Sequence, residues 1–286
     1  MGNNSGNDTP WKSAKDKVES ETRNYEQKKH DAITSSPVKK LAGHLDTSTR
    51  EYIEHQVMSE PYWFQKIEVM PGLFTPGWSD PATEKLPVYG LPEDLSGLRV
   101  LDVGCAEGFF SFEAERRGAR EVIAIDSFPD SVRRFNIIKS ARQSSATAYL
   151  CNVYDLDKKK FGTFDLVLFY GVFYHLKHPQ LALEKIADIC TGKLLFQTHI
   201  HEEPSLKGTP WAKYHPYGIM SGTDKQSFDP TVFWLFNSAC CVAMLDHLGF
   251  KNIETVSEDP QPFVLTAEAA AIERGYPVNQ ATAPWC

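Results

Sequence analysis

The chain has 286 residues, enough for one large domain or two small ones and for a full hydrophobic core. Apolar types make up 42% of it, aromatics 12% and charged types 23%, a composition that excludes disordered, fibrous and repeat proteins. The 30 basic and 37 acidic residues give a net charge of −7, which argues against a nucleic-acid partner whose phosphates must be neutralised.

No targeting signal is visible in the sequence. The first 30 residues contain no apolar block, and the longest apolar run, Leu166 to Tyr174, is far too short to span a bilayer. The six cysteines show no C-x-x-C spacing, so neither a zinc site nor a disulfide framework is indicated. We therefore expect a cytoplasmic protein without a membrane segment.

Composition divides the chain into three parts. Residues 1–60 form a polar, partly helical N-terminal extension, and residues 269–286 form a C-terminal tail. Residues 61–268 carry the patterning of a folded domain. Within that domain the aromatic-rich segments 61–78 and 201–236 are expected to act as lids over a bound molecule, although 61–78 also suits a cover over the core.

Strands and helices alternate along the folded part. Helices are predicted over 49–58, 109–118, 129–142, 181–190 and 238–250. Strands are predicted over 98–104, 121–126, 146–153, 164–171 and 193–200, followed by two closing strands at 251–258 and 261–269. Nearly continuous apolar strands that alternate with helices are typical of a parallel sheet covered on both faces. The predicted fold class is therefore α/β, with an antiparallel pair at one edge.

A glycine-containing turn, D-V-G-C-A-E-G over 102–108, connects the first predicted strand to the first helix of the sheet. In open parallel sheets, ligands bind at the carboxyl ends of the strands, and glycines let the backbone approach a ligand closely. A dinucleotide fingerprint would need glycine at 104, 106 and 109, but Ala106 and Phe109 stand at two of these positions. The turn therefore disfavours a dinucleotide pyrophosphate.

Polar residues also end the next two predicted strands. Asp126 lies 18 residues beyond Gly108, and its carboxylate can accept both hydroxyls of a ribose. At the end of the third strand, Asn152 can offer its amide to a purine edge and Val153 its backbone N–H. Three such features at successive strand ends favour a ribose-bearing ligand over unrelated caps and turns.

These segments resemble the motifs of class I S-adenosylmethionine-dependent methyltransferases. The resemblance rests on V-L-D-V-G-C-A-E-G, V-I-A-I-D and F-D-L-V-L-F-Y-G-V-F-Y-H-L, and it covers about residues 61–268. It implies a Rossmann-like, seven-stranded, mostly parallel sheet with helices on both faces. It also implies S-adenosyl-L-methionine as the cofactor.

A narrower resemblance is to the branch that contains the tRNA wobble-uridine carboxymethyltransferases and their small-molecule relatives. It rests on residues 63–77, 171–179 and 232–238. The tRNA enzymes have an arginine just before the last segment that helps to hold the carboxylate of a carboxylated cofactor, whereas this chain has D-P-T-V over 229–232. Lys66 is only a loose match to a lysine of that branch. The missing cation favours ordinary S-adenosylmethionine.

The resemblance implies a role for each strand-end residue. Asp102 and the 104–108 loop would hold the methionine portion of the cofactor, and Asp126 would hold the ribose. Asn152 and Val153 would contact the adenine, and the backbone at Tyr170 would lie near the amino group. The cofactor-binding residues predicted in this way are Asp102, Gly104, Cys105, Glu107, Gly108, Asp126, Asn152, Val153 and Tyr170.

Candidate catalytic groups follow the fourth and fifth strands. A hydroxyl or amine acceptor must lose a proton, and a neutral imidazole is suited to take it. Tyr174 matches a tyrosine of the branch, and His199 and His201 would share one face of their strand. The predicted catalytic residues are Tyr174, His175, His199 and His201, with structural hydrogen bonding as the alternative for each histidine. No full set of metal ligands is visible, so we expect no metal.

Aromatic side chains near these motifs suit a positively charged sulfonium group, or else belong to the core. The candidates are Trp63, Trp78, Phe109, Tyr170, Phe173 and Tyr174. Two aromatic-rich lids favour a compact acceptor over a polymer, so we expect methyl transfer to a small molecule of the secondary-metabolite type. Two alternatives stay open: cyclisation or cleavage of the cofactor, which releases methylthioadenosine, and modification of a tRNA wobble uridine. The sequence does not indicate the oligomeric state.

Overall fold

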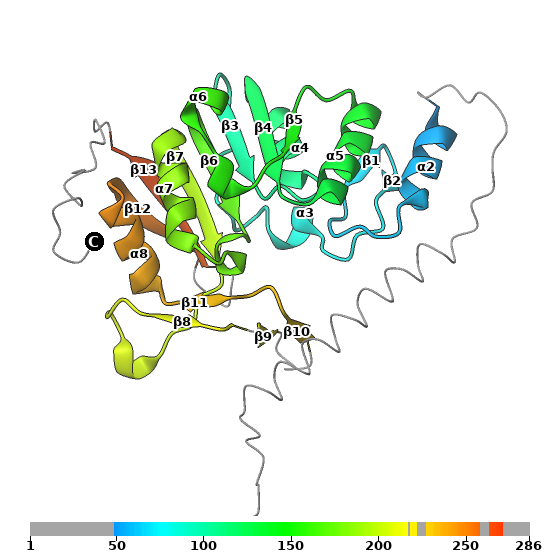
Figure 1. Cartoon of the computed structure of the whole chain (residues 1–286). Helices are drawn as coiled ribbons and strands as arrows, with labels where there is room; N and C mark the ends of the chain where they lie inside the picture. Colours follow the sequence, from blue (N-terminus) through cyan, green and yellow to red (C-terminus); the bar gives the residue numbers. More distant parts are fainter. Residues whose placement is uncertain (1–48, 217, 222–226, 258–262, 271–286) are drawn as a thin grey trace, which may run out of the picture.

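The computed structural model describes residues 49–216, 218–221, 227–257 and 263–270. Most of the expected polar extension and nearly all of the expected tail lie outside these residues. The main feature is a seven-stranded sheet with the strand order β12-β13-β7-β6-β3-β4-β5 (Figure 1). This architecture confirms the predicted Rossmann-like fold.

The sheet is parallel except at one edge. Strands β3 to β7 run parallel to one another, β13 is antiparallel to β7, and β12 is antiparallel to β13. The central strands are nearly continuous runs of buried apolar residues, as strands covered on both faces must be. The strands are β3 (Arg99–Val103), β4 (Glu121–Asp126), β5 (Thr147–Leu150), β6 (Phe164–Tyr170), β7 (Cys190–Thr198), β12 (Phe250–Ser257) and β13 (Phe263–Ala269).

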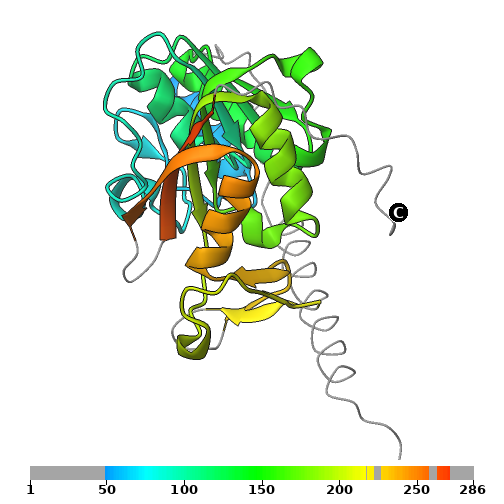
Figure 2. The same cartoon turned by 90° about the vertical axis from the view of Figure 1, so that its left-hand side faces the viewer.

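Helices cover both faces of the sheet, and each face has its own core (Figures 1 and 2). On one face lie α6 (Lys158–Phe161), α7 (Pro179–Ile189) and α8 (Ser238–His247). On the other lie α2 (Arg50–Ser59), α4 (Phe109–Arg116) and α5 (Pro129–Arg142). No helix among the described residues is long and apolar enough to cross a membrane.

The aromatic segment after α2 belongs partly to the second core. It forms a short hairpin of β1 (Glu68–Met70) and β2 (Leu73–Phe74), followed by α3 (Pro81–Glu84). Trp63 is 2% exposed and donates from its indole N–H to the carbonyl of Val57. Trp78, at the other end of the segment, is 70% exposed. One end of the segment therefore covers the core, and the other remains available to a ligand.

The insertion between β7 and α8 forms two short antiparallel strand pairs that lie below the main sheet in Figure 1. One pairs β8 (Ala212–Tyr214) with β11 (Trp234–Phe236), and the other pairs β9 (Ile219–Ser221) with β10 (Ser227–Asp229). The insertion also contains the 3-10 helix η3 (Pro204–Leu206), and two further 3-10 turns follow β5 and β6, namely η1 (Val153–Asp155) and η2 (Phe173–His175). None of these short elements was expected from the sequence.

Candidate functional site

A cavity of about 1070 Å³ lies at the carboxyl ends of the parallel strands. Its walls come from the ends of β3, β4 and β6 and the turns that follow them. The segment before β3 and residues just before β11 close it from the other sides. The strand ends that the sequence singled out therefore meet around one space.

The turn after β3 brings the backbone of Gly104 to this cavity, whereas Gly108 is not part of the lining. Gly104 and Gly108 both have a positive φ, and an added Cβ would lie 2.3 Å from Val172 at position 104 and 2.3 Å from Phe135 at position 108. Ala106 also has a positive φ, of 50°, which costs a residue with a Cβ about 1–2 kcal/mol. The backbone of this turn is therefore fixed in a shape that only glycine adopts freely.

Asp126 holds the turn in place and faces the cavity. One carboxylate oxygen accepts the backbone N–H of Ala106 at 2.9 Å, and the other accepts that of Phe128 at 2.9 Å. Burial raises the pKa of this carboxyl, and the two backbone N–H groups oppose that shift. Each oxygen keeps a second lone pair, so the oriented carboxylate can still accept two hydroxyl groups.

Asp102 is a buried acid at the end of β3. Its carboxylate accepts the hydroxyl of Ser111 at 2.6 Å. Burial, with a smaller contribution from the charge of Asp126, raises its pKa to about 7 against the opposing hydrogen bond from Ser111. A cation placed beside Asp102 in the cavity would favour its ionised form.

The far end of the cavity combines an amide with an aromatic ring. Asn152 caps η1 by accepting the backbone N–H of Tyr154 at 3.1 Å, so its predicted role in adenine binding would use the remaining amide group. Val153, beside it, is buried. Phe128 lines the cavity and is 67% exposed. No pattern in the sequence singled out this phenylalanine, which follows Asp126 by two residues.

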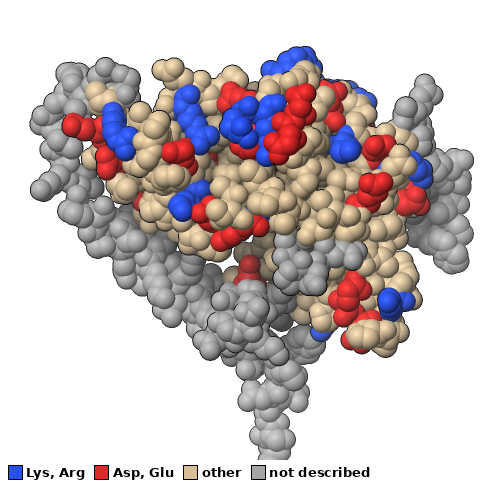
Figure 3. Space-filling model, turned by 180° about the vertical axis from the view of Figure 1, so that it is seen from behind, with Lys and Arg blue, Asp and Glu red and all other residues tan. Residues whose placement is uncertain are grey.

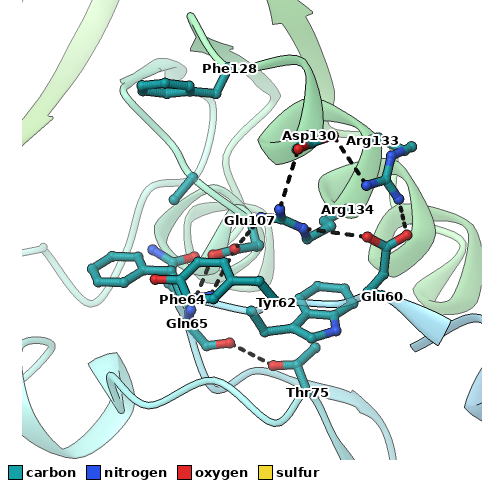
Figure 4. A network of polar contacts seen from close by, with 12 residues as sticks. Glu60, Tyr62, Phe64, Gln65, Thr75, Glu107, Phe128, Asp130, Arg133 and Arg134 are labelled. Atoms are coloured by element: carbon teal, nitrogen blue, oxygen red, sulfur yellow. Dashed lines mark hydrogen bonds and ion pairs between the residues drawn. The ribbon is translucent and has the colours of Figure 1, made fainter. Parts of the chain in front are cut away.

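Glu107 is turned toward the segment before β3. Its carboxylate accepts the backbone N–H groups of Phe64 at 3.0 Å and Gln65 at 3.1 Å, and the guanidinium of Arg134 at 3.1 Å (Figure 4). In return, the side-chain oxygen of Gln65 accepts the N–H of Phe109 at 3.1 Å. Glu107 therefore joins the ligand-side turn to the aromatic segment, and direct contact with a cofactor stays a prediction.

The other half of the cavity contains three of the four predicted catalytic residues. The ring of Tyr174 lies 4.1 Å from that of His175 and 4.3 Å from that of His199, centroid to centroid. Burial lowers the pKa of His175 and raises that of the Tyr174 hydroxyl above its usual range. An imidazole with a lowered pKa is neutral at physiological pH and can accept a proton.

His201 lies outside the cavity lining, which corrects its expected position beside His199. β7 ends at Thr198, so the alternation that places residues 199 and 201 on one face no longer applies. The backbone N–H of His201 instead bonds the carbonyl of Phe236, and its ring packs against Trp211 with the centroids 5.8 Å apart.

Only half of the aromatic residues that were expected to suit a sulfonium group line the cavity. Trp78, Tyr170 and Tyr174 line it, and the Tyr170 hydroxyl donates to the carbonyl of Tyr89 at 2.9 Å. Trp63 and Phe173 are buried, and Phe109 packs against the second core. These last three are core residues, as the alternative interpretation held.

Lys85 lines the cavity, although no pattern in the sequence singled it out. Its ammonium lies 5.0 Å from the centroid of the Phe64 ring, and burial lowers its pKa. Lys66, which the family resemblance singled out, instead bonds Asp80 at 2.9 Å on the surface. No motif surrounds Lys85, so only its position in the fold identifies it. Among the described residues, no group of three His, Cys, Asp or Glu side chains is placed to hold a metal ion.

Comparison with known proteins identifies the family. Residues 80–255, more than half of the chain, match a family described as a methyltransferase domain. The chain belongs to this methyltransferase family. The class I superfamily expected from the sequence is therefore confirmed.

Curated relatives of this methyltransferase include tRNA U34 carboxymethyltransferases. That of Actinobacillus succinogenes is 25% identical over 166 residues, which cover 57% of this chain and 48% of the relative. That of Colwellia psychrerythraea is 29% identical over 172 residues, covering 58% of this chain and 48% of the relative. The chain spans about half the length of these curated relatives.

A solved structure shows the same fold. The N-terminal domain of EvdMO1, crystallised in the presence of S-adenosylhomocysteine (SAH) and D-fucose, superposes with a TM-score of 0.62 at 21% sequence identity. The match covers 77% of this chain and 97% of that domain. At this identity the likeness establishes the fold alone.

Proposed function

We propose that this methyltransferase binds S-adenosylmethionine in the cavity and transfers its methyl group to a small-molecule acceptor. The observation that carries the proposal is the continuity of the cavity. The acidic strand ends at Asp102 and Asp126 and the aromatic and imidazole groups at Tyr174 and His175 line the same space. A cofactor held by the first pair would therefore present its reactive end near the second.

The residues present suit the chemical groups of this cofactor. Asp102 would hold the ammonium of the methionine portion, and the ammonium of Lys85 would hold its carboxylate. Asp126 would accept the two ribose hydroxyls, and Asn152 with the ring of Phe128 would contact the adenine. Gly104 lines the cavity without a side chain, so its backbone can approach the cofactor, whereas the bare face of Gly108 is turned to the ring of Phe135.

The cofactor supplies an electrophilic methyl group on a positively charged sulfur. The work left to the protein is to align an acceptor with that methyl group and to exclude water. Positioning of this kind supplies up to about 7–11 kcal/mol of rate acceleration. The aromatic faces of Trp78, Tyr170 and Tyr174 suit a cationic centre, and His175 or His199 would take a proton from the acceptor.

The cavity favours a small acceptor over a polymer. Its volume of about 1070 Å³ exceeds the upper end of typical small-molecule sites, about 300–1000 Å³, and so accommodates a cofactor with a compact second substrate. On the face seen in Figure 3, lysine and arginine side chains are interspersed with acidic ones. With a net charge of −7, this pattern gives little support to the tRNA substrate in the relatives' names. We place the reaction in the cytoplasm, because the six cysteines show no spacing typical of a disulfide framework.

Product analysis tests this proposal. The protein is incubated with S-adenosylmethionine alone, with the small-molecule fraction of a cell extract, or with bulk tRNA, and the products are separated by mass spectrometry. We expect SAH to accumulate only with the small-molecule fraction. Methylthioadenosine formed from the cofactor alone would instead establish cyclisation or cleavage, and modified tRNA would establish a nucleic-acid substrate.

A further inference from the structure

His175 lies at the end of a chain of hydrogen bonds that begins at a carboxylate outside the sheet. Its Nδ1 lies 2.8 Å from the hydroxyl of Thr231 and 3.1 Å from the carbonyl oxygen of the same residue. The Thr231 hydroxyl donates to the carboxylate of Asp229 at 2.5 Å. The segment that contains Thr231 immediately precedes β11, so the insertion supplies the two residues and the 3-10 turn after β6 supplies the histidine.

The directions of these bonds determine where the imidazole proton lies. A carbonyl oxygen only accepts hydrogen bonds, and the single hydroxyl proton of Thr231 is already donated to Asp229. Both contacts of Nδ1 therefore require that Nδ1 carry the proton. The lone pair of the neutral ring then lies on Nε2, and His175 lines the cavity.

We propose that Asp229 and Thr231 are positioning residues that hold His175 as the general base for an acceptor hydroxyl group. This inference rests on the proposed methyl transfer and names its acceptor class. A hydroxyl is a weak nucleophile until its proton is removed, so it needs a base of this kind in the transition state. The arrangement follows the general pattern of a base whose other nitrogen is oriented by a third group.

The methyl transfer and the accompanying proton transfer use only the groups already named. The acceptor O–H bond breaks, and its proton goes to Nε2 of His175. The oxygen electron pair forms the new O–CH₃ bond, and the carbon–sulfur bond breaks with its electron pair going to sulfur. The positive charge therefore moves from the sulfonium to the imidazolium, where the carboxylate of Asp229 stabilises it through Thr231.

The groups around His175 shift its pKa in both directions. Burial lowers its pKa most strongly, the charge of Asp229 and the hydrogen bond to Thr231 raise it, and His199 lowers it. Tyr174 packs on the ring, and its hydroxyl pKa is raised. Lys177, two residues along, lies 5.5 Å from the centroid of the Phe233 ring. Asp229 is therefore the charged group in this set that favours the protonated ring.

Histidine NMR on the full chain tests the proposal without any substrate. Long-range nitrogen–proton spectra of histidine-labelled protein distinguish the two neutral tautomers, and the His175 signal is identified by its loss in His175→Gln. We expect the neutral ring to carry its proton on Nδ1. We also expect Asp229→Asn and Thr231→Val each to lower the pKa of His175 by about one unit, the low end of the effect of a nearby opposite charge.

Two matched variants separate this role from a structural one. Thr231→Ser keeps the hydroxyl and should keep the wild-type pKa of His175, whereas Asp246→Asn removes an exposed carboxylate paired with Lys251 and should leave it unmoved. A neutral ring protonated on Nε2, or a His175 pKa unchanged in both Asp229→Asn and Thr231→Val, would overturn the proposal. Failure of the proposed function has a different signature, because calorimetry on the wild-type protein would then detect no binding of S-adenosylmethionine.

Discussion

Gly108 combines a positive φ with a close neighbour. An alanine there would have a φ of 94° and a Cβ 2.3 Å from the ring of Phe135. We expect Gly108→Ala to lower the free energy of unfolding by about 2–4 kcal/mol, because backbone strain and overpacking add. Urea unfolding measures this loss of stability. Gly97 is the control, since its φ is 77° but no atom lies within 4 Å of an added Cβ. Gly97→Ala should therefore lower stability only through backbone strain. Equal losses of stability in both variants would show that the contact with Phe135 contributes nothing.

The raised pKa of Asp102 makes cofactor binding depend on pH. Burial raises this pKa to about 7 in the free protein, so near pH 6 the carboxyl is mostly protonated. Binding of an ammonium group lowers the pKa, and the proton must leave. We expect affinity for S-adenosylmethionine to rise from about pH 5 to pH 7, with release of close to one proton at about pH 6. Calorimetry in two buffers of different ionisation enthalpy measures this release. Asp102→Asn should show none, and the same proton release in that variant would assign it to another group.

Single residues could be predicted from the sequence when they stand in a motif at a strand end. Asp102, Asp126 and Asn152 were found in this way, because parallel strands bring their carboxyl ends together. Lys85 and Phe128 were missed, because no spacing rule connects Lys85 to the sheet and because an exposed phenylalanine after a strand has no sequence signal of its own. The direction of the Glu107 carboxylate could not be read either, since it depends on a segment more than 40 residues earlier.

At the scale of elements, the aromatic segment 61–78 depends on one buried acid. In Glu107→Ala, two backbone N–H groups lose their acceptor and Arg134 loses a buried partner (Figure 4). Arg134 keeps Glu60 as an ion-pair partner, so we expect a loss of about 2–6 kcal/mol in urea unfolding, mainly from the two N–H groups at about 1–3 kcal/mol each, together with weaker cofactor binding. Asp80→Asn, which breaks a surface ion pair with Lys66, should cost less than about 1 kcal/mol. A small effect of Glu107→Ala would show that the segment is held by its buried apolar residues alone.

Regular elements were predictable where hydrophobic periodicity is long. The helix over 129–142 was predicted with its observed bounds. Helix α7 begins at Pro179, two residues earlier than expected, because a proline is readily accommodated in the first turn. The short strands of the insertion were missed, because three-residue pairs such as β8 and β11 are defined by partners distant in sequence rather than by local pattern. The insertion nevertheless supplies Thr231 and Phe233 to the cavity, where a lid over a bound molecule was expected.

At the scale of the whole molecule, the strand order explains where the site lies. β3 lies between β4 and β6, and the chain crosses from one side of β3 to the other between β5 and β6. Ligands bind outside the carboxyl ends of strands where the order reverses in this way. Alternating strands and helices predicted the parallel sheet, and the family resemblance implied the seven-stranded fold. The proposed cofactor position follows from this topology, and the proposed acceptor position from the segments added before β3 and after β7.

Asp126 is proposed to hold the ribose diol of a nucleoside at this edge of the sheet. Calorimetric titration of SAH into the wild-type protein and Asp126→Asn tests it most directly, with the exposed-site variant Asp246→Asn as control. We expect binding to the wild type and the control, and a loss of at least about tenfold in Asp126→Asn, the value of one charge-assisted hydrogen bond. Absence of binding to the wild-type protein, or equal affinity in Asp126→Asn, would contradict the account.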